Sequence, residues 1–141
     1  MYEHILLPVD LDEKKQLSLP VAVDYAKAFG AQLHVMTVVP EFGMSIISQY
    51  FPGNSDDKMI QAAQVALKDF TKKHIPEGIK VQHIVGQGTV YQVIIETSEK
   101  INADLIIMGA HRPDLKDYLL GPNAARVVRH SDKSVLVVRD K

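Results

Sequence analysis

Short, unbroken runs of apolar residues alternate along this chain with longer segments in which apolar residues recur at helical spacing. Residues 5–7 and 105–108 carry no polar interruption, which is typical of strands buried on both faces of a parallel sheet. Strands are expected at residues 4–10, 31–39, 78–85, 105–108 and 134–139. The third run alternates before it turns apolar, which favours a place nearer the edge of the sheet.

Helices are expected between these strands, at residues 18–29, 55–74, 89–101 and 121–130. Pro20 falls in a first helical turn, where proline is tolerated, and Gly30 is a suitable residue just past a helix end. The residues predicted to face the core of the first helix are Leu17, Val21, Tyr25, Ala28 and Phe29. Those of the second helix are Ile60, Ala63, Leu67 and Phe70.

Strands that alternate with helices predict an α/β fold, a doubly wound parallel sheet with helices on both faces. Right-handed crossovers and short loops favour the strand order 3-2-1-4-5, in one domain over residues 1–141. In that order the winding direction reverses between the first and fourth strands. Ligands of such sheets bind outside the carboxyl ends of the strands at this reversal, where Asp10 and Gly109 are expected.

Composition narrows the class of protein. The 16 basic and 17 acidic residues give a net charge of −1, so no basic surplus indicates nucleic acid. The chain has no cysteine, which excludes a disulfide framework and a thiolate nucleophile. The first residues enter a strand directly, with no signal peptide pattern, and no apolar run approaches the roughly 20 residues that span a bilayer. We therefore expect a soluble cytoplasmic protein.

The segment from Gly109 to Ala124 is the strongest candidate for binding chemistry. A buried strand ends at Gly109, a long connection follows, and Gly121 precedes a helix with Pro122 at its first position. Ordinary strand-to-helix connections take about two to six residues. This one is well beyond that range, which favours a binding loop over an ordinary connection. Because a helix start presents unpaired N–H groups and a positive dipole end, the segment favours a phosphate site. It is not a P-loop, since no Gly-Lys-Ser/Thr follows.

Other candidate residues carry weaker signals. Asp10 either hydrogen-bonds a nucleotide or serves as a turn residue. Arg112 either pairs with phosphate or is a solvated loop residue. The sequence Gly86-Gln-Gly88 lacks the third glycine of a dinucleotide fingerprint, because Tyr91 stands there, so a turn plus a helix cap explains it better. The six histidines form no metal-ligand spacing, and no Ser-His-Asp arrangement is readable.

Two further segments favour intermolecular contacts. Residues 41–54 form a long irregular stretch with five large apolar residues, which suits either a lid or a loop packed on the sheet. The last strand, from Ser134 to Arg139, is apolar and lies at a predicted sheet edge, where it invites pairing with another chain. A two-fold homodimer through this strand is expected, and a higher oligomer stays open.

These motifs together resemble the universal stress protein family over essentially the whole chain. The resemblance rests on Ile5-Leu-Leu-Pro-Val-Asp10, on the run from Asp104 through Gly109 to Arg112, and on the last strand. The segment from Gly109 to Gly121 is most similar to the F-type members. The resemblance implies an adenine nucleotide α-hydrolase-like fold that binds ATP, with or without Mg²⁺, and forms dimers. The site residues that it implies are Pro8, Val9, Asp10, Val39, Met108, Gly109, His111, Arg112, Gly121, Asn123 and Ala124.

The sequence departs from the family's phosphate motif, Gly-x-x-Gly, a spacer and Gly-Ser/Thr, at three points. Arg112 replaces the second glycine, and the spacer to Gly121 is one residue shorter. Pro122 replaces the Ser or Thr, which removes a hydroxyl and a backbone N–H from the phosphate cradle. We therefore predict weaker triphosphate binding than in a relative with serine there.

Three hypotheses of function follow. The first is an ATP-binding stress-response protein that acts through nucleotide-dependent conformation or partner choice, with no catalytic residues and no metal site of its own. The second is a slow ATPase that uses His111 or Asp114 to position water. The third is an interaction module with a degenerate nucleotide pocket. A phosphate-release assay separates the first two, and equilibrium dialysis with ATP and AMP tests the third.

Overall fold

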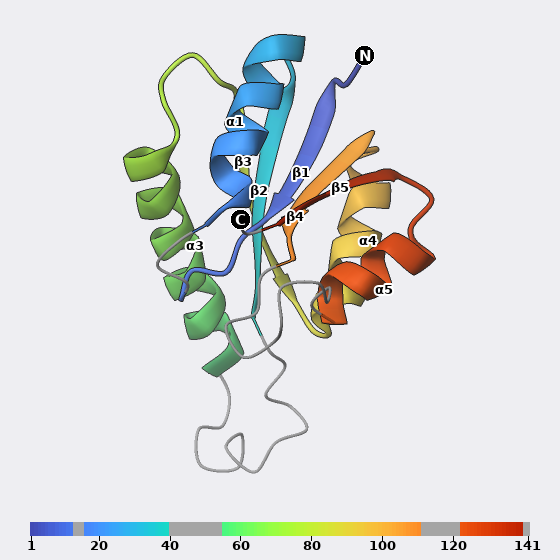
Figure 1. The fold of residues 1–141 in the computed structure, drawn as a ribbon. Coiled ribbons are helices and arrows are strands. Elements are labelled where there is room, and N and C mark those ends of the chain that lie inside the picture. The colour runs from blue at the N-terminus through green and yellow to red at the C-terminus, as the bar shows by residue number, and fades with distance from the viewer. Residues whose placement is uncertain (13–15, 40–54, 111–121, 140–141) are drawn as a thin grey trace.

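The computed structural model describes residues 1–12, 16–39, 55–110 and 122–139 (Figure 1). The irregular segment at residues 41–54 lies outside the described residues, as do His111, Arg112 and Gly121. The side chains of Ser55 and Asp56 are also outside them.

A five-stranded parallel sheet forms the centre of the described chain, in the order β3-β2-β1-β4-β5. Its strands are β1 (His4–Pro8), β2 (Gln32–Val39), β3 (Val81–Gln87), β4 (Leu105–Gly109) and β5 (Ser134–Val138). Strand β1 pairs with β2, where His4 lies beside Gln32, and with β4, where Ile5 lies beside Leu105. The expected fold class and strand order are confirmed, and the winding direction reverses between β1 and β4.

The helices cover both faces of this sheet (Figure 1). Helices α1 (Ser18–Phe29) and α3 (Ser55–His74) pack on one face, and α4 (Val90–Lys100) and α5 (Pro122–His130) pack on the other. Since consecutive side chains of a strand point to opposite faces, the apolar runs of β1, β2 and β4 supply both packing surfaces. This explains why the centres of β1 and β4 are unbroken apolar runs, whereas β2 also carries the buried polar residues His34 and Thr37.

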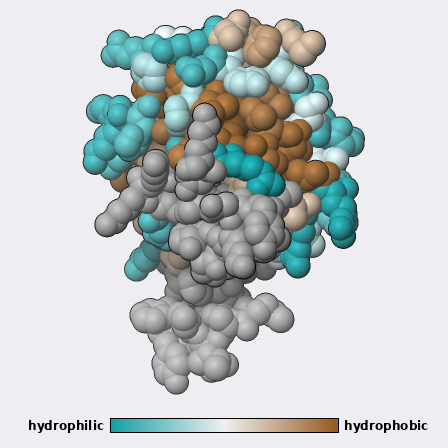
Figure 2. Space-filling view, in the orientation of Figure 1, coloured by the Kyte–Doolittle hydropathy of each residue, from teal (hydrophilic) through white to brown (hydrophobic). Residues whose placement is uncertain are grey.

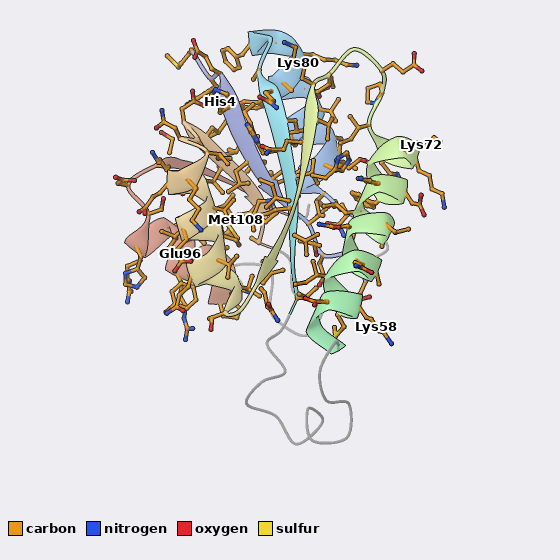
Figure 3. The ribbon with its side chains drawn as sticks, turned by 180° about the vertical axis from the view of Figure 1, so that it is seen from behind. His4, Lys58, Lys72, Lys80, Glu96 and Met108 are labelled. Atoms are coloured by element: carbon orange, nitrogen blue, oxygen red, sulfur yellow. The ribbon has the colours of Figure 1, made fainter. Side chains whose placement is uncertain are left out.

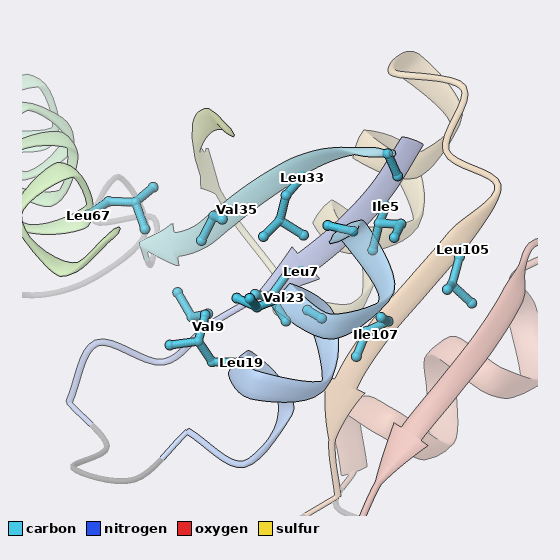
Figure 4. Close-up of a cluster of buried hydrophobic side chains, with 13 residues drawn as sticks. Ile5, Leu7, Val9, Leu19, Val23, Leu33, Val35, Leu67, Leu105 and Ile107 are labelled. Atoms are coloured by element: carbon cyan, nitrogen blue, oxygen red, sulfur yellow. The ribbon is translucent and has the colours of Figure 1, made fainter. Parts of the chain in front are cut away.

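The first apolar cluster lies between the sheet and helices α1 and α3 (Figure 4). Ile5, Leu7 and Leu33 from the sheet have no exposed surface, and Leu67 of α3 is equally buried. The stripe predicted for α3 is therefore confirmed at its centre.

The stripe predicted for α1 is wrong at its centre, although two of its residues, Val21 and Tyr25, are partly buried and pack against the cluster. The buried residues of this helix are Ser18, Leu19, Ala22, Val23 and Ala26, whereas Phe29 is exposed. Two alanines at the contact let the helix approach the sheet closely, so the larger residues of the predicted stripe lie at the border of the cluster. Ala22 and Ala26 carry too little apolar surface to stand out in a sequence pattern.

The second apolar cluster lies under α4 and α5. Leu6, Met36 and Ile106 of the sheet contact Ile94 of α4 and Val127 of α5, and each of these residues is at most 1% exposed. The two clusters use alternate residues of the same strands. Strands β2 and β4, the two neighbours of β1, therefore contribute side chains to both apolar clusters.

Most predicted element bounds agree with the structure within two residues, but the third strand is shifted. It was expected at residues 78–85 and lies at Val81–Gln87. Gly78 has a φ of 96°, a left-handed conformation that belongs to a turn and not to a strand. The strand begins where Val81 pairs with Leu33 and ends where Gln87 pairs with Val39. Among the described residues, no helix is long and apolar enough to cross a membrane.

Candidate functional site

The carboxyl ends of β1 and β4 lie next to each other, at the point where the winding direction reverses. Val9 continues the pairing of β1 beyond Pro8, because its N–H donates to the carbonyl oxygen of Met36 at 2.8 Å. Val9 and Val39 are both 8% exposed, so the ends of β1 and β2 are apolar up to their last residues. An apolar surface at two neighbouring strand ends suits a flat aromatic ring.

Asp10 follows this strand end as an exposed residue. Its Oδ1 accepts the backbone N–H of Asp12 at 3.0 Å, and its backbone oxygen accepts a hydrogen bond from the Gln16 side chain. Asp10 is therefore a turn residue, as one of its two interpretations from the sequence predicted. A nucleotide-contacting role uses the same exposed carboxylate, so the two interpretations are compatible.

Gly109 ends β4 beside Val138 and is exposed. A Cβ atom at this position would meet no heavy atom within 4 Å, and its φ is not among the positive ones. No fold requirement for glycine is therefore visible among the described residues. The N–H of Ala110 then donates to the carbonyl oxygen of Val138 at 2.9 Å, which extends the pairing of β4 with β5 by one residue.

The start of α5 holds the remaining predicted residues that the structure describes. Pro122 is exposed, Asn123 is half-buried and Ala124 is 1% exposed. The side chains of Ala124 and Met108 lie in the second apolar cluster, so their contribution to a site is limited to the backbone. Asn123 contributes a half-buried polar side chain at the start of this helix. His111, Arg112 and Gly121 lie outside the described residues.

The Gly86-Gln-Gly88 sequence has a structural explanation. A Cβ atom at Gly86 would lie closer than 3.0 Å to Cγ1 of Val93, so glycine lets α4 pack tightly on β3. Gly88 has a φ of 129°, and its N–H donates to the carbonyl oxygen of Val39 at 3.0 Å. The predicted turn is confirmed, but the predicted helix cap is not, because Thr89 makes no side-chain capping bond.

Arg126 of α5 lies over the ring of Tyr91 of α4, with 5.0 Å from its Cζ to the ring centroid. This cation–π contact joins the two helices that cover one face of the sheet. Arg126 lies one turn into α5, a position from which an anion contact is conceivable in sequence, but its contact in the structure is with Tyr91. His130, in the last turn of α5, lies 6.2 Å from the same ring between centroids.

Sequence spacing did not reveal a group of polar residues across three strands. His4 Nδ1 lies 3.1 Å from His34 Nε2, and His34 Nδ1 contacts Oε1 of Gln82. Only the strand register brings these residues together, since they are about 30 and 48 positions apart. Burial lowers the pKa of His34, the hydrogen bond that its ring makes to the Gln82 side chain opposes this lowering, and the charge of His4 adds to it.

His83 makes a separate contact on the other face, 2.6 Å from Thr71 Oγ1 of α3. Burial lowers the pKa of His83, and the positive charge of Lys68 lowers it further. Within the described ranges no group of three or more His, Cys, Asp or Glu residues could hold a metal ion.

Comparisons with known proteins agree on one family. The model of the universal stress protein family matches residues 1–139. Universal stress protein G of Salmonella typhimurium is 28% identical over 144 residues, which cover 99% of this chain and 100% of that protein.

Solved structures give the same result. The structure of MJ0577, a universal stress protein of Methanocaldococcus jannaschii, matches with a TM-score of 0.76 and 29% identity, covering 100% of this chain and 98% of that chain. A crystal structure of a universal stress protein in complex with cAMP matches with a TM-score of 0.76 and 18% identity, covering 99% of both chains. At that identity the second match supports the fold alone.

Proposed function

Because this chain belongs to the universal stress protein family, we propose that it binds ATP and acts as a nucleotide-dependent regulatory protein in the stress response. The observation that supports this most is the placement of Asp10 and Gly109 at adjacent strand ends, where the sheet changes its winding direction. A protein of the same fold has been crystallised with cAMP, which contains both an adenine and a phosphate.

The adenosine half of the nucleotide is proposed to lie over the ends of β1 and β2. Pro8, Val9 and Val39 offer apolar contact area to the adenine ring, and the Asp10 carboxylate accepts hydrogen bonds from ribose hydroxyls. Asp10 is held for this role by its bond to the N–H of Asp12, because the bond fixes the side-chain orientation.

The phosphates are proposed to lie between Gly109 and the start of α5. The open space at Gly109 admits a close approach of phosphate to the backbone. Asn123 and the N–H groups of the first turn of α5 add hydrogen-bond donors, and the helix dipole favours an anion there. His111, Arg112 and Gly121 are proposed as further contacts by their sequence positions. Any Mg²⁺ is held by the phosphates and water, since Mg²⁺ keeps most of its water ligands in such sites.

A homodimer through β5 forms the second part of the proposal. Val135, Leu136, Val137 and Val138 of this edge strand are all only partly buried. In Figure 2, hydrophobic residues gather on the face where β1, β4 and β5 lie in Figure 1. Antiparallel pairing of two β5 strands would cover both the strand edge and these side chains. A Leu136→Lys variant is expected to be monomeric by light scattering, and a dimer unchanged by it would exclude this interface.

Calorimetric titration with ATP tests the nucleotide proposal. We expect saturable binding in the wild type and a loss of about 10–150-fold in Asp10→Ala, because a hydrogen bond to a charged group contributes about 1.5–3 kcal/mol. Asp10→Asn keeps an oxygen that can accept the Asp12 N–H but removes the negative charge. Comparing it with Asp10→Ala therefore separates the effect of losing the turn from the effect of losing the charge. Asp12→Asn, an exposed aspartate in the same turn, is the matched control. Equal affinity in Asp10→Ala and the wild type would contradict the assignment of Asp10.

A further inference from the structure

A buried histidine with both ring nitrogens engaged lies far from the proposed nucleotide site. His34 is 4% exposed, and it contacts Gln82 through Nδ1 and His4 through Nε2. These residues come from β2, β3 and β1, three neighbouring strands of the sheet. His4 begins β1, and Figure 3 shows it at the end of the sheet opposite to the carboxyl ends of the strands.

The hydrogen positions in this group follow from its atoms. Oε1 of Gln82 can only accept, so Nδ1 of neutral His34 carries the hydrogen and Nε2 has the lone pair. A hydrogen bond between the two rings then requires that His4 Nδ1 carries a hydrogen and donates it to His34 Nε2. The second ring nitrogen of His4, Nε2, is left to bind a proton.

Two added protons have different consequences. A first proton on His4 Nε2 leaves both hydrogen bonds in place and makes the bond between the rings charge-assisted. A second proton must go to His34 Nε2, where it faces the N–H of His4. That step replaces a hydrogen bond by two opposed N–H groups and two like charges, inside an apolar layer that disfavours charge.

Charged groups near this cluster come from the residue before β4 and from α4. Asp104, just before β4, accepts the backbone N–H of Glu3 at 2.8 Å and that of His4 at 3.2 Å. From α4, which packs on the same face, the last turns present Glu96, Glu99 and Lys100, all exposed. From β3 the group facing His34 is the neutral Gln82.

We propose that His4, His34 and Gln82 form an acid-sensitive latch that joins the amino-terminal ends of β1, β2 and β3 and opens when His34 is protonated. Because the folded pKa of His34 is lowered from 6.5, the latch is fully closed above pH 6.5 and weakens as the pH falls below it. Opening exposes His34 to water, so each opening takes up a proton in that range. The latch gives the sheet a response to acid that is separate from nucleotide binding.

Ring-nitrogen NMR of the wild type tests the latch without any substitution. At pH 7.5 we expect neutral His34 with hydrogen on Nδ1, and an Nδ1 of His4 that carries a hydrogen. A neutral His34 with hydrogen on Nε2 would overturn the proposal.

Hydrogen exchange then measures the opening. The N–H of Gln32 donates to the carbonyl oxygen of Glu3 at 2.9 Å, and that of Asp104 to the carbonyl oxygen of His4 at 3.0 Å, so these two amides report whether the start of β1 is closed. Between pH 6.5 and 5, protection factors corrected for intrinsic exchange should fall up to about tenfold per pH unit in the wild type, the limit for uptake of one proton.

A pair of variants assigns this fall to His34. His34→Gln cannot take up the proton, so its protection should be nearly independent of pH over the same range. His74→Gln replaces an exposed histidine of α3 and should behave as the wild type. The same fall in His34→Gln as in the wild type, or no fall in the wild type, would show that His34 does not control the opening.

Discussion

Gly86→Ala is expected to destabilise the fold, because the structure leaves no space for a methyl group at this position. The new Cβ would lie closer than 3.0 Å to Cγ1 of Val93 and 3.6 Å from Cε of Met36. Val93 is β-branched and helical, so its side chain has one strongly preferred rotamer and cannot turn away cheaply. The methionine is flexible and can adapt. The clash therefore falls on the contact between α4 and β3.

The expected loss of folding stability can be estimated from these contacts. Overpacking of this kind costs about 1–3 kcal/mol, and replacing glycine by alanine at a compatible φ returns about 0.4–1 kcal/mol through the unfolded state. The net loss for Gly86→Ala is then about 1–2 kcal/mol. Val93→Ala removes two half-buried carbons and costs about 1 kcal/mol. The double variant should lose only about 1 kcal/mol in total, because its remaining Val93 Cβ lies 3.7 Å from the new methyl group, an ordinary contact.

Urea denaturation of the four proteins at pH 7 measures this coupling. Gly109→Ala is the matched control, since its Cβ would meet nothing within 4 Å, and its stability should equal or slightly exceed that of the wild type. Additive losses in the double variant, or a Gly86→Ala protein as stable as the Gly109→Ala protein, would refute the argument that α4 requires glycine at this position.

Three other predictions test separate parts of the structure. Pro122→Ser restores a backbone N–H and a hydroxyl at the start of α5, so ATP affinity measured by calorimetry should rise by at least about tenfold; unchanged affinity would exclude a phosphate contact there. Arg126→Gln should lower the free energy of unfolding in urea by about 0.5–1 kcal/mol, and by less in a Tyr91→Leu background, where the cation–π contact is already absent. Equal losses in the two backgrounds would contradict a stabilising cation–π contact. Because the folded pKa of His83 is lowered, the free energy of unfolding falls as the pH drops below 6.5. The melting temperature of His83→Gln should therefore fall less than that of the wild type between pH 7 and 5. Equal falls would exclude His83 as a source of acid sensitivity.

The fold was predictable from the sequence because its strands and helices have distinct patterns. The unbroken apolar runs of β1 and β4 indicated strands buried on both faces, and the glycine at position 30 marked the end of α1, where its φ is 63°. The number and order of the elements then left few parallel topologies. The reversal between the first and fourth strands followed from that order and placed Asp10 and Gly109 at neighbouring strand ends.

Contacts that depend on register and close packing were not predictable. His4, His34 and Gln82 are far apart in sequence, and a shift of one residue between strands would turn His34 to the other face. The buried side of α1 was mispredicted because alanines carry little apolar weight in a pattern, although close packing favours them. The clash at Gly86 likewise depends on the distance between α4 and β3.

The central claim is that an adenine nucleotide binds at the carboxyl ends of β1 and β4. Backbone amide NMR of the wild type during a titration with ATP tests it most directly, because every described strand end is observed at once. The account predicts saturable chemical-shift changes at Asp10, Gly109 and Asn123. Little change is expected at Gln32 and Asp104, which lie at the opposite, amino-terminal ends of the strands. No chemical-shift changes at millimolar ATP, or changes confined to the amino-terminal ends of the strands, would contradict the claim.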